Sequence, residues 1–131
     1  MNSLELQTMV QVFAVVHLVT VGLSHIAAHQ AWAGFFIRVR DQGEPGVLMV
    51  GLMSLGFGSV IVAFHPVWSG LPLALTLFGW AQVVKGVLYL CIPSYGLKKL
   101  GLVSLDRSRM FLAPGFFLLA LALVIAWSWR P

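Results

Sequence analysis

Residues 45–84 read PGVLMVGLMSLGFGSVIVAFHPVWSGLPLALTLFGWAQVV and contain no Asp, Glu, Lys or Arg. The stretch is long enough for two membrane-spanning helices, because each crossing takes about 20 residues. Its middle, HPVWSGLP at 65–72, carries the helix-breaking and turn-forming residues Pro66, Gly70 and Pro72. The stretch therefore predicts two apolar helices joined by a short turn.

Two further charge-free stretches flank this hairpin, at residues 6–37 and 110–129. Across the chain 60% of residues are hydrophobic, only 9% are charged and the mean hydropathy is +0.94, values that exclude an ordinary soluble domain. The sequence predicts an all-α integral membrane protein, a compact bundle of four transmembrane helices in a single domain, residues 1–131. The expected spans lie at roughly 9–31, 46–64, 73–92 and 111–129.

The basic residues orient the expected bundle. They concentrate in two connections, after the first span and between the third and fourth: Arg38, Arg40, Lys98, Lys99, Arg107 and Arg109. The positive-inside rule puts these connections in the cytoplasm and both termini outside. Small size and basic connections favour a bacterial inner membrane. The formal charge of +4 is read as topology, so we expect no nucleic-acid partner.

A cleaved signal peptide is the alternative for the N-terminus, since Ala31-Trp32-Ala33 resembles a small-x-small cleavage site. The early region has Glu5 and no Lys or Arg, and its apolar run is long and rich in His and Gln, so a retained span is favoured. Cys91 is the single cysteine, which excludes an internal disulfide and dithiol redox chemistry.

Polar residues follow one face of the first span and one face of the third. At 100° per residue, Gln11, His25 and His29 share a face. In the third span Gln82, Lys85 and Tyr89 follow i, i+3, i+7 spacing. We expect the two faces to meet in a polar intramembrane pocket, with these ligand candidates: His25, His29, Gln82, Lys85 and Tyr89. The equally supported alternative is that the polar groups link helices while Lys85 snorkels to the headgroups.

The four histidines also allow a metal or haem site. His25 and His29, four residues apart on a helix, direct two imidazoles at a common ion. His17 lies about 12 Å above His25 along a helix, so it cannot join them at one metal, but His17 and His65 form a candidate axial pair for haem. No Asp or Glu lies inside a span, which excludes a carboxylate-bridged di-iron site.

Small residues mark one face of the second span. Gly51, Ser54 and Gly58 have the spacing that lets helix backbones approach closely. We expect a helix-packing role for them, with the first span, the third span or another copy of the chain as partner.

Three functions remain open. The favoured one is a binding or assembly protein, self-associating or an accessory subunit of a membrane complex, whose pocket takes lipid or a small hydrophobic ligand. The second is a redox protein with a histidine-ligated haem or transition metal. The third is a membrane enzyme or transporter for an anionic or amphipathic substrate, with Lys85 as charge partner and His25 or His29 as acid/base group.

Overall fold

The computed structural model describes residues 1–131 and is built from helices, with no strands. The Asn2 side chain caps the first helix by accepting a hydrogen bond from the Glu5 backbone N–H. In chain order the elements are α1 Ser3–Ala27, α2 His29–Asp41, α3 Glu44–Phe64, α4 Leu73–Cys91, α5 Pro93–Leu100, the 3₁₀ helix η1 Ser108–Phe111 and α6 Leu112–Trp127.

Four of these helical segments are long and apolar enough to cross a membrane: α1, α3, α4 and η1 with α6. The predicted all-α membrane fold with four spanning helices is therefore confirmed. The expected second, third and fourth spans correspond closely to α3, α4 and α6. The chain is an integral membrane protein.

The first predicted span, 9–31, is wrong at its end. The helix stops at Ala27, because Ala28 has φ −120° and ψ 36°, outside the helical region, and α2 starts in a new direction at His29. The break carries neither Pro nor Gly. The Trp32 indole N–H donates to Ser24 Oγ at 2.9 Å, so a tertiary contact holds the corner between α1 and α2.

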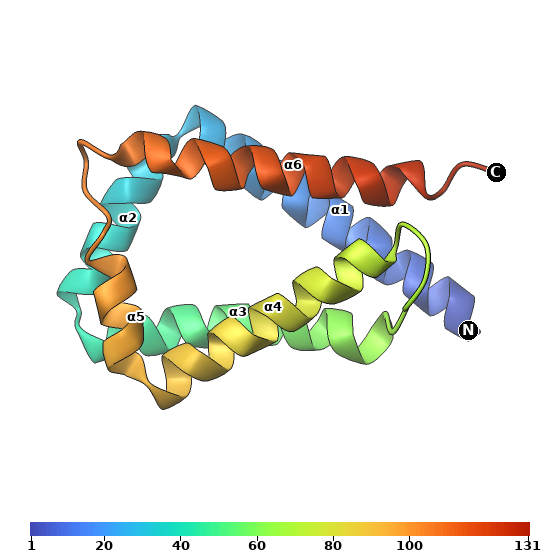
Figure 1. Cartoon of the computed structure of the whole chain (residues 1–131), viewed down its shortest axis with the longest axis horizontal. Coiled ribbons are helices and arrows are strands. Elements are labelled where there is room, and N and C mark those ends of the chain that lie inside the picture. Colours follow the sequence, from blue (N-terminus) through green and yellow to red (C-terminus); the bar gives the residue numbers. More distant parts are fainter.

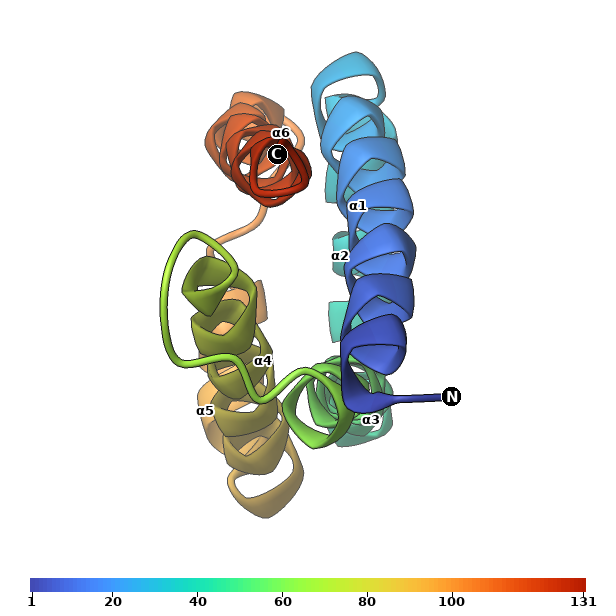
Figure 2. The ribbon, with the colours of Figure 1, turned by 90° about the vertical axis from the view of Figure 1, so that its right-hand side faces the viewer.

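The spanning helices form two antiparallel pairs, α1 with α6 and α3 with α4 (Figure 1). Viewed from the end that carries both termini, α6, α1, α3 and α4 are arranged in a ring (Figure 2). Packing within each pair is extensive, whereas α1 against α3 and α4 against α6 meet only locally. The space between the pairs is where the candidate site lies.

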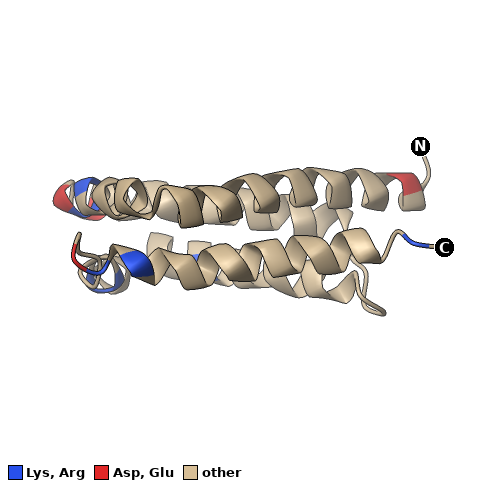
Figure 3. Cartoon of the chain, turned by 90° about the horizontal axis from the view of Figure 1, so that it is seen from above, with Lys and Arg blue, Asp and Glu red and all other residues tan.

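Two short helices, α2 and α5, lie across the end of the bundle opposite the termini (Figure 1). Most Lys and Arg residues gather at this same end (Figure 3). Residues 29–41 and 93–100 were expected to be span ends and loops, and are instead helical. Both helices combine buried apolar residues, such as Val39 and Leu100, with exposed basic ones, such as Arg38 and Lys98, as helices lying on a membrane surface do.

The chain passes twice through the same order of elements. A span, a short helix at the basic end and a returning span occur first as α1, α2, α3 and then as α4, α5, α6. The first span of each half packs against the last span of the other half, α1 with α6 and α4 with α3. The two halves are thus interleaved, and the central space lies between corresponding helices.

Glycines allow the close approach within each pair. A Cβ on Gly58 would lie 2.6 Å from the Gly79 carbonyl oxygen, and one on Gly22 would lie 2.9 Å from that of Gly115. Gly51 and the buried Ser54 share the face of Gly58, and Gly51 packs on the α4 side chain of Tyr89. The small-residue face of α3 therefore contacts α4 of the same chain, one of the three partners considered.

Three buried apolar clusters stabilise the fold on either side of the central space. The largest joins all four spans and includes Leu18, Ile61, Leu75 and Ile125. The other two lie where α2 and α5 meet the spans, around Val47 with Tyr89 and around Ala33 with Phe111. Apolar burial thus closes both ends of the bundle.

Candidate intramembrane binding site

A cavity of about 430 Å³ lies between the two helix pairs, walled by residues of all four spans and of α2. Nine of its 15 lining residues are hydrophobic. The wall consists of His17, Leu18, Val21, His25, Trp32, Phe36, Met53, Ser54, Phe57, Phe78, Gln82, Lys85, Pro114, Phe117 and Leu118.

The polar side chains of the wall come mainly from α1 and α4, the corresponding first spans of the two halves. His17 and His25 project from α1, and Gln82 and Lys85 from α4, in each case one or two turns apart. The returning spans α3 and α6 add mostly aromatic and aliphatic side chains, with Ser54 as the polar exception. The cavity therefore has two polar walls and two apolar ones.

Lys85 is the one Lys, Arg, Asp or Glu residue of the cavity wall, and no carboxylate pairs with it. The chain has a single ion pair, between Arg40 and Asp41 at the basic end. The Lys85 ammonium instead lies 5.5 Å from the centre of the Tyr89 ring, a cation–π distance. An unpaired ammonium inside a membrane is costly, which makes Lys85 a functional candidate.

Aromatic contacts along the cavity wall connect the two helix pairs. His17 stacks on Phe57 with ring centres 4.4 Å apart, joining α1 to α3. Phe57 also meets Phe78 of α4, and Phe78 meets Phe117 of α6, both at 6.2 Å. These rings form an apolar wall, against which a hydrocarbon chain or flat ring can pack.

At the basic end the cavity is bounded by the corner between α1 and α2. His25 donates from Nδ1 to the Val21 carbonyl oxygen at 2.8 Å, and its ring stacks on Trp32 at 4.2 Å. Since Nδ1 holds the proton in this contact, Nε2 of a neutral His25 is the acceptor nitrogen. His25 thus contributes a polar atom in an otherwise aromatic wall.

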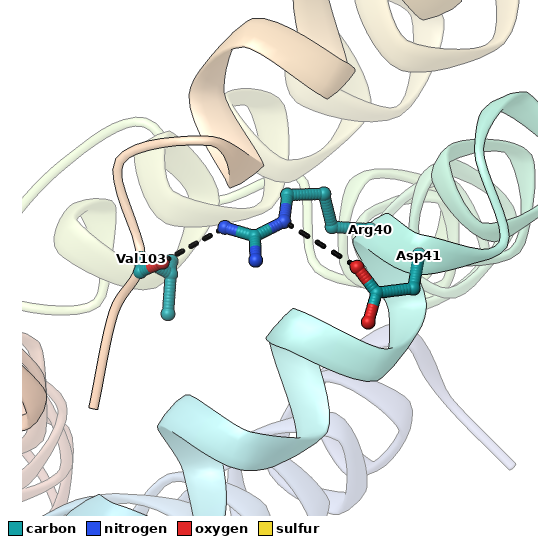
Figure 4. Close-up of polar contacts among 3 residues, drawn as sticks. All are labelled: Arg40, Asp41 and Val103. Atoms are coloured by element: carbon teal, nitrogen blue, oxygen red, sulfur yellow. Dashed lines mark hydrogen bonds and ion pairs between the residues drawn. The ribbon is translucent and has the colours of Figure 1, made fainter.

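Further contacts hold α2 in place at the basic end of the cavity. Arg40 donates from Nη1 to the Val103 carbonyl oxygen at 3.0 Å, which joins α2 to the segment between α5 and η1, and its Nε lies 3.8 Å from Asp41 (Figure 4). His29 shares a hydrogen bond with Ser108 of η1, at 2.9 Å. The two connections at the basic end are therefore bound to each other.

A buried hydrogen-bond network ties the helix pairs together at the end that carries the termini. The Trp129 indole N–H can only donate, so Gln11 Oε1 accepts it, at 2.6 Å, and Gln11 Nε2 donates to His65 Nε2, at 2.9 Å. His65 Nδ1 therefore carries the proton and donates to Thr76 Oγ1, at 3.1 Å. The Thr76 hydroxyl completes the network by donating to the His65 carbonyl oxygen at 2.9 Å.

This network holds His65 neutral. Its ring is fully buried, with 0% of the residue exposed, and burial lowers the pKa of the His65 imidazole below its usual range. A second proton, on Nε2, would place two donors face to face at the contact with Gln11. Neutral His65 is thus part of the closed end of the bundle.

The structure places the predicted site residues in different groups. Lys85, Gln82 and His25 share the cavity, which His17 also lines. Tyr89 is buried beside Lys85 but does not line this cavity, and His29 belongs to the contact between α2 and η1.

Neither of the two proposed histidine pairs is arranged to bind a metal or haem. The break at Ala28 puts His25 and His29 on different helices, so the spacing of one continuous helix does not apply. His65 uses both ring nitrogens in hydrogen bonds, and His17 is stacked on Phe57, so the axial pair would require the network to break. No cluster of three or more His, Cys, Asp or Glu residues is placed to hold a metal ion.

Comparisons with known proteins give no match. No protein-family model matches the chain, and no curated protein or solved structure is significantly similar to it.

The sequence reasoning missed the aromatic members of the site and the partners of His65. Trp32 and Phe36 reach the cavity because α2 turns under the bundle, which no breaker residue signals. Gln11 was on the polar face of the first span, but its contact with the 65–72 turn depends on how the helix pairs are placed. Thr76 has no sequence feature that distinguishes it from other span threonines.

Proposed function

We propose that this chain is a small membrane-embedded binding protein whose central cavity takes a lipid or another small hydrophobic molecule with a polar group. The cavity of about 430 Å³ between the helix pairs is the observation that carries the proposal. Ligand sites of proteins have volumes of about 300–1,000 Å³ and combine apolar walls with a few converging polar groups. Lys85, Gln82, His17 and His25 are such groups here.

The location of the cavity supports a ligand drawn from the membrane. Met53 and Phe117 line the cavity and are also exposed, at 65% and 58%, on helices that face lipid. A molecule dissolved in the bilayer can therefore reach the space between the pairs without crossing a polar surface. We propose further that the end with α2 and α5 faces the cytoplasm of a bacterial inner membrane, with both termini outside.

Binding is better supported than assembly. The expected association surface, Gly51, Ser54 and Gly58, packs on α4 of the same chain and is buried. Self-association or docking in a larger complex would therefore use another face of the bundle.

Photolabelling with a long-chain fatty acid that carries a diazirine tests the proposal. The reconstituted protein should be labelled at residues of the cavity wall, and Val21→Trp, which fills the cavity from α1, should lose most of that labelling. Leu23→Trp is the matched control, because Leu23 is exposed and lines no described cavity.

The result has two clear outcomes. Label on wall residues that is displaced by excess unlabelled fatty acid and lost in Val21→Trp supports the cavity as a binding site. Label confined to lipid-facing residues, unchanged by either tryptophan, would refute it. Both variants should be checked by gel filtration, so that a loss of label is not a loss of fold.

A further inference from the structure

Lys85 and Lys99 line a second hollow, which shares only Lys85 with the central cavity. This groove has a volume of about 290 Å³ and lies where α4 meets α5. Its wall consists of Ala81, Val84, Lys85, Leu88, Tyr89, Tyr95 and Lys99. The two lysines also share a smaller hollow of about 180 Å³ beside Val103 and Phe111. Two ammonium groups thus border the same spaces.

No acidic residue balances this pair. Neither ammonium makes a hydrogen bond or ion pair within the chain, and each lies 5.5 Å from the centre of a tyrosine ring, Lys85 from Tyr89 and Lys99 from Tyr95. Like charges that share a partly desolvated groove destabilise each other unless an anion lies between them. The groove therefore has the electrostatics of an anion site.

The rest of the groove is apolar and faces the membrane. Ala81, Val84 and Leu88 form one strip of α4, in which Leu88 lies nearest the basic end and Ala81 farthest from it, and Val84 is 55% exposed. Lys85 lies six residues before the end of α4 at Cys91, about 9 Å into the span at 1.5 Å per residue. Lys99 lies on α5, at the surface. Lys99 thus lies at the surface, the long side chain of Lys85 can extend from within the span toward the headgroups, and Ala81 and Val84 lie at acyl-chain depth.

We infer that this groove binds an anionic phospholipid, with its phosphate between Lys85 and Lys99 and one acyl chain along Ala81, Val84 and Leu88. A bilayer lipid is the occupant because the apolar strip is exposed to the membrane. The two tyrosines lie at the boundary, where aromatic residues contact headgroups. Basic pockets at the cytoplasmic ends of spans are recognised sites for anionic headgroups.

This site shares Lys85 with the central cavity of the proposed function, and its other lining residues are different. Lys99, Tyr95 and Val84 do not line the central cavity, so the groove can be changed without altering the cavity wall beyond Lys85. Fatty-acid labelling of the cavity should therefore persist in Lys99→Met.

Native mass spectrometry of the detergent-purified protein tests the inference. The wild type is offered equal amounts of phosphatidylglycerol and phosphatidylcholine with identical chains, and we expect a phosphatidylglycerol adduct of one lipid per chain to dominate. Lys85→Met and Lys99→Met should each weaken that preference about fivefold or more. Lys98→Met is the matched control, since it removes the same charge from α5 but does not line the groove. Lys99→Arg should keep the preference.

Three results would overturn the inference. One is equal adduct formation by the two lipids in the wild type. Another is an equal effect of Lys98→Met and Lys99→Met, which would indicate general attraction to the basic surface. The third is displacement of the lipid by glycerol 3-phosphate at a similar concentration, which would mean that the groove recognises a free phosphate. Lys99 lies on the surface helix α5, so Lys99→Met should fold and still tests the inference if Lys85→Met does not fold.

Discussion

Replacing Thr76 with valine should destabilise the bundle without changing its shape. Thr76 is fully buried, and its hydroxyl accepts from His65 Nδ1 and donates to the His65 carbonyl oxygen. Valine has the same outline but no hydroxyl, so both hydrogen bonds are lost. Hydrogen bonds between membrane helices contribute about 0.6 kcal/mol on average and up to about 1.7. The loss of two predicts a decrease of about 1–3 kcal/mol in the free energy of unfolding.

Reversible unfolding by sodium dodecyl sulfate in mixed micelles measures this difference. The control is Thr20→Val, since Thr20 is exposed on α1 and makes no side-chain hydrogen bond within the chain. The Thr76 effect should also depend on Gln11, because Gln11 holds His65 in position through Nε2. A loss below about 0.5 kcal/mol, equal to that of the Thr20 control, would refute a stabilising role for the contacts between Thr76 and His65.

Three other predictions follow from the same packing. The folded protein lowers the pKa of His65, so below the usual pKa of about 6.5 the unfolded state takes up a proton that the folded state does not. The free energy of unfolding should therefore be constant above that pH and fall below it. Unfolding measured from pH 8 to 5 should show this slope in the wild type and a smaller one in His65→Gln. Gly58→Leu should lower the free energy of unfolding by about 3 kcal/mol or prevent folding, since a Cβ there would lie 2.6 Å from the Gly79 carbonyl oxygen. The control Gly56→Leu places its side chain in open space and should remain near wild type in gel filtration and thermal unfolding. Trp32→Phe should lower the free energy of unfolding by about 1 kcal/mol in the same detergent assay, because it loses the hydrogen bond to Ser24 Oγ, and no change would contradict a role for Trp32 at the corner between α1 and α2.

Much of the fold could be predicted because membrane insertion depends on local composition. The charge-free stretches and the turn around Pro66 and Gly70 place three of the four spans within a few residues of α3, α4 and α6. The end of α1 could not be found in this way, because Ala28 leaves the helical region under a tertiary contact rather than at a breaker residue. The same contact turns residues 29–41 into a helix across the bundle end.

The candidate site was only partly predictable for a related reason. Helical rotation correctly groups Gln82 with Lys85, since both lie within one uninterrupted helix. It fails for His25 and His29, because the helix breaks between them. The placement of the helix pairs decides which helix packs on a small-residue face and which side chain hydrogen-bonds to a buried polar group such as His65. No short-range pattern in a single sequence gives that placement.

The most direct test of the central claim is an experimental density map of the wild-type protein in a lipid environment, at a resolution that shows side chains. We expect an elongated density between the α1–α6 and α3–α4 pairs, packed on Phe57 and Phe78, with its polar end near Lys85 or His25. Four spans closed on one another, with side chains filling the space between the pairs and no room for a ligand, would contradict it.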